Sequence, residues 1–112
     1  MGYRSEVHLG IDEAIVEQLL TFAGINQECY KLLFEYADAT EKTKKGGIYF
    51  RWEHIKWYDS YDEISKLQKF LQEHDDHYKF LRLGESVEDV EEEGYSEEYY
   101  FSISRSVDVD YE

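Results

Sequence analysis

Apolar and polar positions alternate over residues 3–11, a period of two that predicts a strand with one buried face. After Asp12, a candidate N-cap, the apolar positions recur at three- and four-residue spacing, which predicts helix. Gly24 weakens that helix and Asn26 offers a second N-cap. Residues 12–39 therefore form either one kinked helix or two.

The next pattern change comes at residues 40–47, which are polar, end in two glycines and predict a loop. Residues 48–55 are rich in β-branched and aromatic side chains and predict a central strand. Within that strand the apolar residues Ile48, Phe50 and Trp52 share one side, whereas the apolar residues Ile55 and Trp57 fall on the other side. We therefore expect it to bulge, twist strongly or end near His54.

The second half of the chain predicts one helix and two strands. Residues 60–63 have the S-x-x-E spacing of a capping box, so a helix is expected to begin there. Residues 78–83 predict a strand, residues 85–98 an acidic loop, and the alternation over residues 99–111 a long amphipathic strand.

The expected fold class is α+β, in the order strand, one or two helices, strand, helix, strand, strand. The two final strands are expected to pair as an antiparallel hairpin within a mainly antiparallel sheet, with the helices packed on one face of that sheet. The chain has 112 residues, so we expect residues 1–112 to form a single domain.

Composition excludes several classes of protein. Hydrophobic residues make up 42 % of the chain and aromatics 17 %, too much apolar surface for a disordered chain even at a net charge of -14. No apolar run reaches the length of a membrane span or a signal peptide, so we expect a cytoplasmic protein. Cys29 is the single cysteine and excludes an intramolecular disulfide.

The negative charge lies mostly towards the C-terminus. Residues 84–112 hold eleven acids and one base, and residues 85–98 hold eight acids and no base. Such a segment repels nucleic acid and anionic lipid, so direct binding to either is not expected. It either solubilises the protein or, facing outward as one patch, docks a basic partner. The residues that would bind such a partner are Glu85, Glu88, Asp89, Glu91, Glu92, Glu93, Glu97 and Glu98.

Two features suggest chemistry only weakly. His74-Asp75-Asp76-His77 contains plausible metal ligands, but it lies at a predicted helix end where such residues also serve as caps. Cys29 lies near a predicted helix start, where a thiol pKa can fall, yet a lone helical cysteine is more often a buried apolar residue. No phosphate loop or nucleophile elbow is present. We therefore expect no enzyme activity, no cofactor and no resident metal, and a metal-dependent enzyme is the least favoured reading.

An aromatic run offers an alternative function. Trp52, Trp57, Tyr58 and Tyr61, with Arg51 and Lys56 beside them, either fill the core or form a stacking platform for a planar ligand. In the second case the protein binds or sequesters a nucleotide-like molecule. The residues expected to bind it are Tyr3, Arg4, Arg51, Trp57 and Tyr58.

Three stretches carry a family resemblance: Met1-Gly2-Tyr3-Arg4-Ser5-Glu6-Val7, Phe50-Arg51-Trp52-Glu53-His54-Ile55-Lys56-Trp57-Tyr58 and Phe80-Leu81-Arg82-Leu83-Gly84-Glu85. With the acidic segment that follows, they resemble a group of small uncharacterised bacteriophage and prophage proteins. The resemblance brings no catalytic residues. It implies a phage-encoded protein that acts in the host cytoplasm, where small accessory proteins often inhibit or redirect host machinery.

The leading hypothesis from the sequence is a phage-type accessory protein that binds a basic surface of a host protein. The target would be a defence or nucleic-acid enzyme, and the carboxylates would mimic nucleic acid in part. A homodimer through an edge strand formed by residues 99–111 is a further expectation.

Overall fold

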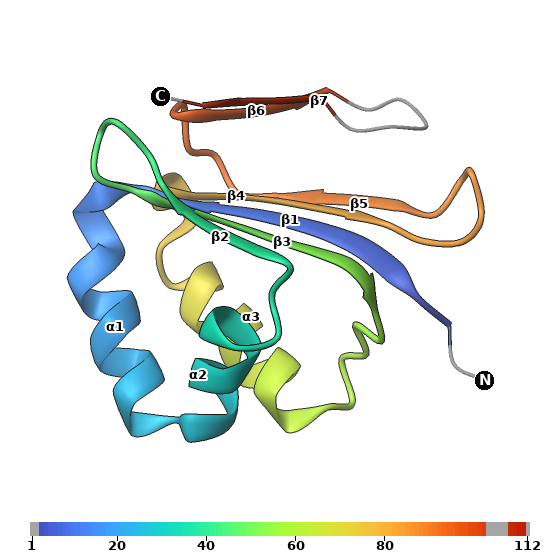
Figure 1. Ribbon diagram of the computed structural model, residues 1–112, viewed down its shortest axis with the longest axis horizontal. Coiled ribbons are helices and arrows are strands. Elements are labelled where there is room, and N and C mark those ends of the chain that lie inside the picture. The colour runs from blue at the N-terminus through green and yellow to red at the C-terminus, as the bar shows by residue number, and fades with distance from the viewer. Residues whose placement is uncertain (1–2, 103–107, 112) are drawn as a thin grey trace.

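The computed structural model describes residues 3–102 and 108–111, and shows an α+β domain in three layers (Figure 1). A five-stranded antiparallel sheet lies in the middle, in the order β2-β3-β1-β4-β5. Helices cover one face, and a two-stranded hairpin lies over the other. The elements are β1 (Ser5–Ile11), the 3-10 helix η1 (Glu13–Ile15), α1 (Val16–Ile25), α2 (Gln27–Phe34), β2 (Ala39–Lys42), β3 (Ile48–Ile55), α3 (Asp62–Gln72), the 3-10 helix η2 (Asp75–His77), β4 (Tyr78–Leu83), β5 (Val90–Glu93), β6 (Tyr99–Ser102) and β7 (Asp108–Tyr111).

The helix side of the sheet carries the larger core. Alternate residues of the three central strands, among them Leu9, Phe50 and Phe80, pack against the apolar stripes of the helices. Trp52 and Trp57 lie in this core with ring centroids 5.2 Å apart. The α+β class and the placement of the helices on one face of an antiparallel sheet are confirmed.

The hairpin side has a second, smaller core of five buried residues: Tyr49, Leu81, Leu83, Tyr99 and Phe101. His8 is buried beside it and lies 2.6 Å from the Tyr49 hydroxyl through Nδ1 and 2.6 Å from the Glu6 carboxylate through Nε2. Burial lowers the pKa of His8, so the imidazole is neutral at pH 7. Because a carboxylate only accepts, Nε2 donates to Glu6 and Nδ1 accepts from Tyr49.

Two expectations about the helices are settled. The segment after β1 is a 3-10 turn followed by two α-helices, α1 and α2, which meet at Asn26. Asp12 and Ser60 do not act as predicted. Asp12 makes no side-chain cap, and α3 begins at Asp62 with Tyr61 as its uncapped N-cap residue, so the expected capping box is wrong.

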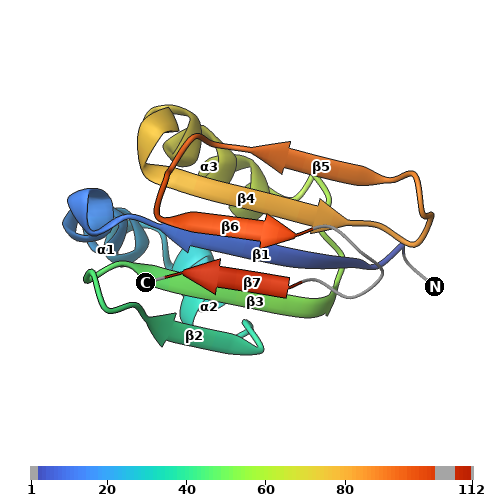
Figure 2. The ribbon, with the colours of Figure 1, turned by 90° about the horizontal axis from the view of Figure 1, so that it is seen from above.

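The strands differ from the prediction in four respects. β2 lies where a loop was expected, and β5 lies within the segment expected to be a loop throughout. β4 pairs with β5 and not with the last strand, so the expected final hairpin is wrong. The expected long strand 99–111 is interrupted: β6 and β7 pair with each other, and residues 103–107 lie outside the described part of the chain. When the sheet is viewed from above, the hairpin lies over β1, with β6 towards β4 and β7 towards β3 (Figure 2).

Candidate functional site

The eight predicted partner-binding acids lie on β5, the outermost strand on one side of the sheet, and on the segments before and after it (Figure 2). Glu85 accepts the backbone N–H of Arg4 at one end of the sheet, and Glu97 lies beside Asp12 and His77 at the other. Four of the eight side chains are exposed: Glu85, Glu88, Glu92 and Glu97. We call these four the acidic edge.

Arg82 forms ion pairs with two of the remaining acids. Its Nη2 lies 2.7 Å from Asp89 Oδ1 and its Nε lies 2.9 Å from Glu91 Oε1, while Nη1 lies 3.0 Å from the Ser5 hydroxyl. The Tyr3 hydroxyl donates to Asp89 Oδ2 at 2.6 Å. The hydrogen bonds from Arg82, which have the larger effect, and from Tyr3 lower the pKa of Asp89. Asp89 and Glu91 therefore hold the segment against the sheet.

The last two acids are partly withdrawn from solvent. Glu93 lies opposite Phe80 on the helix side of the sheet, and burial together with the nearby Glu91 raises its pKa. Burial and the charge of Asp12 raise the pKa of Glu98. Glu92 lies opposite Leu81 and faces the hairpin side. The eight acids therefore point to both faces of the sheet and do not form the single outward patch that was expected, although the four residues of the acidic edge are exposed.

The five predicted ligand-binding residues do not form one site. Trp57 is a core residue with 6 % of its surface exposed. The Tyr58 hydroxyl accepts the backbone N–H of Tyr3 at 2.6 Å, and the Tyr3 hydroxyl accepts the N–H of Glu85 at 2.8 Å, so both phenols serve structural contacts. Arg51 lies opposite His8 on the hairpin side. Arg4 alone of the five lines the cavity described next.

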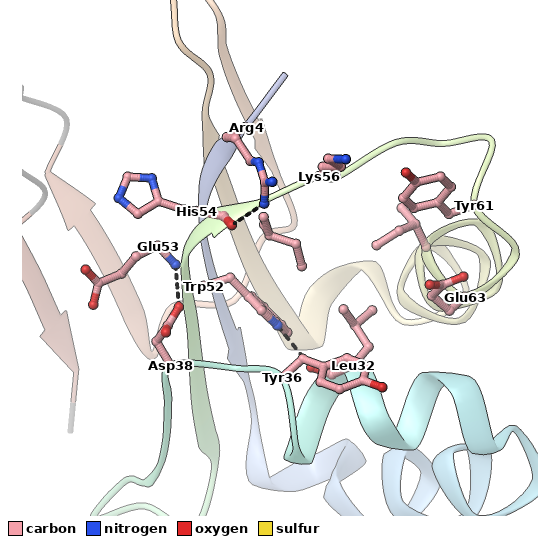
Figure 3. Close-up of a pocket in the computed structure, with 12 residues that line it drawn as sticks. Arg4, Leu32, Tyr36, Asp38, Trp52, Glu53, His54, Lys56, Tyr61 and Glu63 are labelled. Carbon is pink, nitrogen blue, oxygen red and sulfur yellow. Dashed lines mark hydrogen bonds between the residues drawn. The ribbon is translucent and has the colours of Figure 1, made fainter. Parts of the chain in front are cut away.

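A cavity of about 590 Å³ opens beside the end of β3, between that strand and helices α2 and α3 (Figure 3). The register of β1 against β3 shifts between Ser5 and Val7, which places a β-bulge at Glu53 and His54. The extra residue returns Ile55 to the helix side, where it packs against the core. The parity break seen in the sequence is therefore a bulge, and the bulge forms one wall of the cavity.

Side chains satisfy the backbone of the bulge. The Glu53 N–H donates to Asp38 Oδ2 at 2.7 Å, and Arg4 Nη1 lies 3.4 Å from the His54 carbonyl oxygen. Trp52 Nε1 donates to the Leu32 carbonyl at 3.0 Å and fixes the indole at the base of the cavity. These contacts join three segments distant in the chain and hold the wall in place.

The remaining lining is aromatic and charged. Tyr36 and Tyr61, 62 % and 38 % exposed, flank the cavity together with Lys56 and Glu63. The sequence had indicated Trp52, Lys56 and Tyr61 through the aromatic run. Tyr36 and Asp38 were missed because they reach the cavity through tertiary contacts. The bulge at His54 was the available signal for a cavity at this place.

The other candidate groups behave as structural residues. His74 stacks on Phe70, with ring centroids 4.8 Å apart, and His77 Nδ1 lies 3.4 Å from Asp12 Oδ2. Across residues 3–102 and 108–111, no group of three or more His, Cys, Asp or Glu is placed to hold a metal ion. Cys29 is buried, and burial raises its pKa to about 11, so it is the buried apolar residue that a lone helical cysteine more often is, and the alternative of an activated thiolate is wrong.

Comparison with known proteins adds no relative: no family model, no curated protein and no solved structure matches the chain. None of the helices in the described residues has the length and apolar character needed to cross a membrane.

Proposed function

We propose that this protein is a non-enzymatic, phage-type accessory protein that binds a basic surface of a host protein through the acidic edge. The observation that carries the proposal is the exposure of Glu85, Glu88, Glu92 and Glu97 in β5 and in the segments that flank it. The resemblance to phage proteins supplies the setting, the cytoplasm of a host cell.

The acidic edge has two properties that suit a basic partner. Its charge attracts a cationic surface over about a Debye length and raises the rate of association. In addition, β5 has a strand neighbour on one side only, so the other side of its backbone is available to an extended segment. A basic segment laid along β5 would meet carboxylates on both faces.

Mimicry of nucleic acid is the narrower form of the proposal. Residues that share a face of a strand repeat at about 7 Å, which is sparser than the charges of duplex DNA at one per ~1.7 Å of axis. With one of its four acids in β5 and the others in the flanking segments, the acidic edge imitates at most part of a phosphate row. This favours a host defence or nucleic-acid enzyme as the target, one whose groove tolerates incomplete occupation.

The test compares two variants of equal charge. E85Q/E88Q/E92Q/E97Q removes the acidic edge, and E17Q/E28Q/E35Q/E73Q removes four exposed acids in and beside the helices. Each is immobilised beside the wild type, exposed to a bacterial lysate, and the retained proteins are quantified by mass spectrometry. The proposal predicts a basic protein retained by the wild type and the helix variant and lost by the edge variant.

The captured protein is then purified and titrated against each variant. Its affinity is expected to fall at least about tenfold when NaCl rises from about 50 to about 300 mM. Equal retention by the edge variant and the wild type overturns the proposal. Equal loss from both variants also overturns it, because net charge alone would then explain binding.

A further inference from the structure

The cavity beside β3 contains two cationic side chains without an ion-pair partner in the described part of the chain. Among the described residues, the side chains of Arg4 and Lys56 have no carboxylate within ion-pair distance. The Asp38 carboxylate accepts the Glu53 N–H, and Glu53 Oε2 lies 3.5 Å from Arg51 Nη2. Asp38, Glu53 and Glu63 also line the cavity, but Arg4 and Lys56 stand on the same rim and are available to an anionic group there (Figure 3).

The aromatic side chains of the lining suit a planar ring. Arg4, Lys56 and Tyr61 stand along one rim, and Trp52 and Tyr36 lie across from them (Figure 3). Base-aromatic stacking tolerates any base because every base has a π face. Cavities that bury small ligands are typically about 300–1,000 Å³, so about 590 Å³ fits a mononucleotide.

We propose that this cavity binds a nucleoside monophosphate. The phosphate lies between the Arg4 guanidinium and the Lys56 ammonium, a pair of cations suited to a dianion. The base stacks on Tyr61, with Tyr36 opposite. Glu63, in the first turn of α3, accepts hydrogen bonds from the ribose hydroxyls. None of the four residues of the acidic edge lines this cavity, so either site can exist without the other.

Two features of the wall support this assignment. β-bulges are over-represented next to binding sites because they redirect side chains, and this bulge sets the wall on which Arg4 is anchored. Only Nη1 of Arg4 is used by the His54 carbonyl, which leaves most of its N–H donors for a ligand. Glu85 contacts the backbone N–H of Arg4 and lines a neighbouring recess, outside this cavity.

Binding is measured by calorimetry with AMP, GMP, CMP and UMP, each up to about 1 mM. Trp52 provides a second signal, because stacking in the cavity should change its fluorescence. We expect at least one nucleotide to bind, with K56Q and Y61L each weakening it about fivefold or more through loss of a charged contact and of a stacking surface. The nucleoside of that nucleotide, adenosine in the case of AMP, lacks the phosphate and should bind at least about tenfold more weakly than the nucleotide itself.

K44Q is the matched control, since Lys44 is exposed in the loop between β2 and β3 at the opposite end of β3. The affinity of K44Q for the nucleotide should stay within about twofold of that of the wild type. Without ligand, the melting temperatures of K56Q, Y61L and K44Q should all lie within a few degrees of that of the wild type. The inference is overturned by no binding of any of the four nucleotides, by binding that K56Q and Y61L leave unchanged, or by a nucleoside that binds as tightly as its monophosphate.

Discussion

Arg82 links the acidic segment to the sheet through a side chain that is only 16 % exposed. It contacts two carboxylates and the Ser5 hydroxyl. Replacing it by glutamine removes the cation and leaves Asp89 and Glu91 facing each other without compensation. We expect R82Q to lower the free energy of unfolding by about 1–3 kcal/mol, less than for a fully buried pair because both acids are partly exposed. Urea denaturation at pH 7 measures this.

The pH dependence of the stability difference between the wild type and R82Q identifies the cause of that difference. The pKa of Asp89 is lowered from 3.8 in the folded state, so the unfolded chain takes up the proton first as the pH falls. The contribution is present above about pH 3.8 and is lost as the pH falls from there towards the lowered native pKa. The gap between wild type and R82Q should therefore shrink below about pH 4. A gap that is constant down to pH 3 would show that packing, not ion pairing, explains the cost.

The β6–β7 hairpin contacts the sheet through the ring of Tyr99, which packs directly against Gly10. A methyl group at Gly10 would overlap the ring of Tyr99. The Tyr99 hydroxyl lies 2.9 Å from the Ile11 carbonyl oxygen and 3.1 Å from that of Ile48. We expect G10A to displace the ring and lower the free energy of unfolding by about 1–3 kcal/mol, as overpacked sites do. Urea denaturation and the near-ultraviolet circular dichroism of the tyrosines report the change.

Gly24 supplies the matched control. It lies within α1, and a methyl group added there meets nothing within 4 Å. Alanine in a helix is favoured over glycine, so G24A should raise the free energy of unfolding by about 0.5–1 kcal/mol. The same glycine-to-alanine change thus has opposite signs at the two positions. Equal effects would mean that Tyr99 does not occupy the space over Gly10.

How far the fold could be predicted depended on burial. β1, β3, β4 and α3 have a buried face and therefore an apolar period, and all four were expected within a few residues of their bounds. β2 and β5 are edge strands whose side chains are mostly polar. Solvent on one side removes the alternation on which a sequence prediction depends, so both were taken for loops.

Pairing was harder to predict than the elements themselves. The alternation over residues 99–111 continues across both strands of the hairpin, and parity alone does not show where a chain reverses. The cavity shows the same limit. Trp52, Lys56 and Tyr61 are neighbours in sequence and were found together, whereas Tyr36 and Asp38 reach them only after α2 packs beside β3.

At the scale of the whole molecule, charge repulsion opposes folding. The formal net charge is -14, and residues 84–112 contain most of the excess. Compact folding brings these charges closer than they are in the unfolded chain, so screening by salt should stabilise the native state. We expect the melting temperature to rise by several degrees between low salt and about 0.5 M NaCl at pH 7. A melting temperature that falls would mean that favourable ion pairs, such as those of Arg82, outweigh repulsion.

The position of the charges predicts a second difference. The edge variant E85Q/E88Q/E92Q/E97Q and the helix variant E17Q/E28Q/E35Q/E73Q have equal net charge, but only the first removes acids from residues 85–98, a segment that holds eight acids and no base. Repulsion falls with distance and is screened beyond about 8 Å at physiological salt, so the edge acids repel their neighbours more strongly than the dispersed helix acids do. The edge variant should therefore gain more stability at low salt and lose more of the salt dependence, as thermal melts over a NaCl series would show. Equal responses of the two variants would mean that repulsion is spread over the whole surface and that the acidic edge is no more strongly charged than the rest.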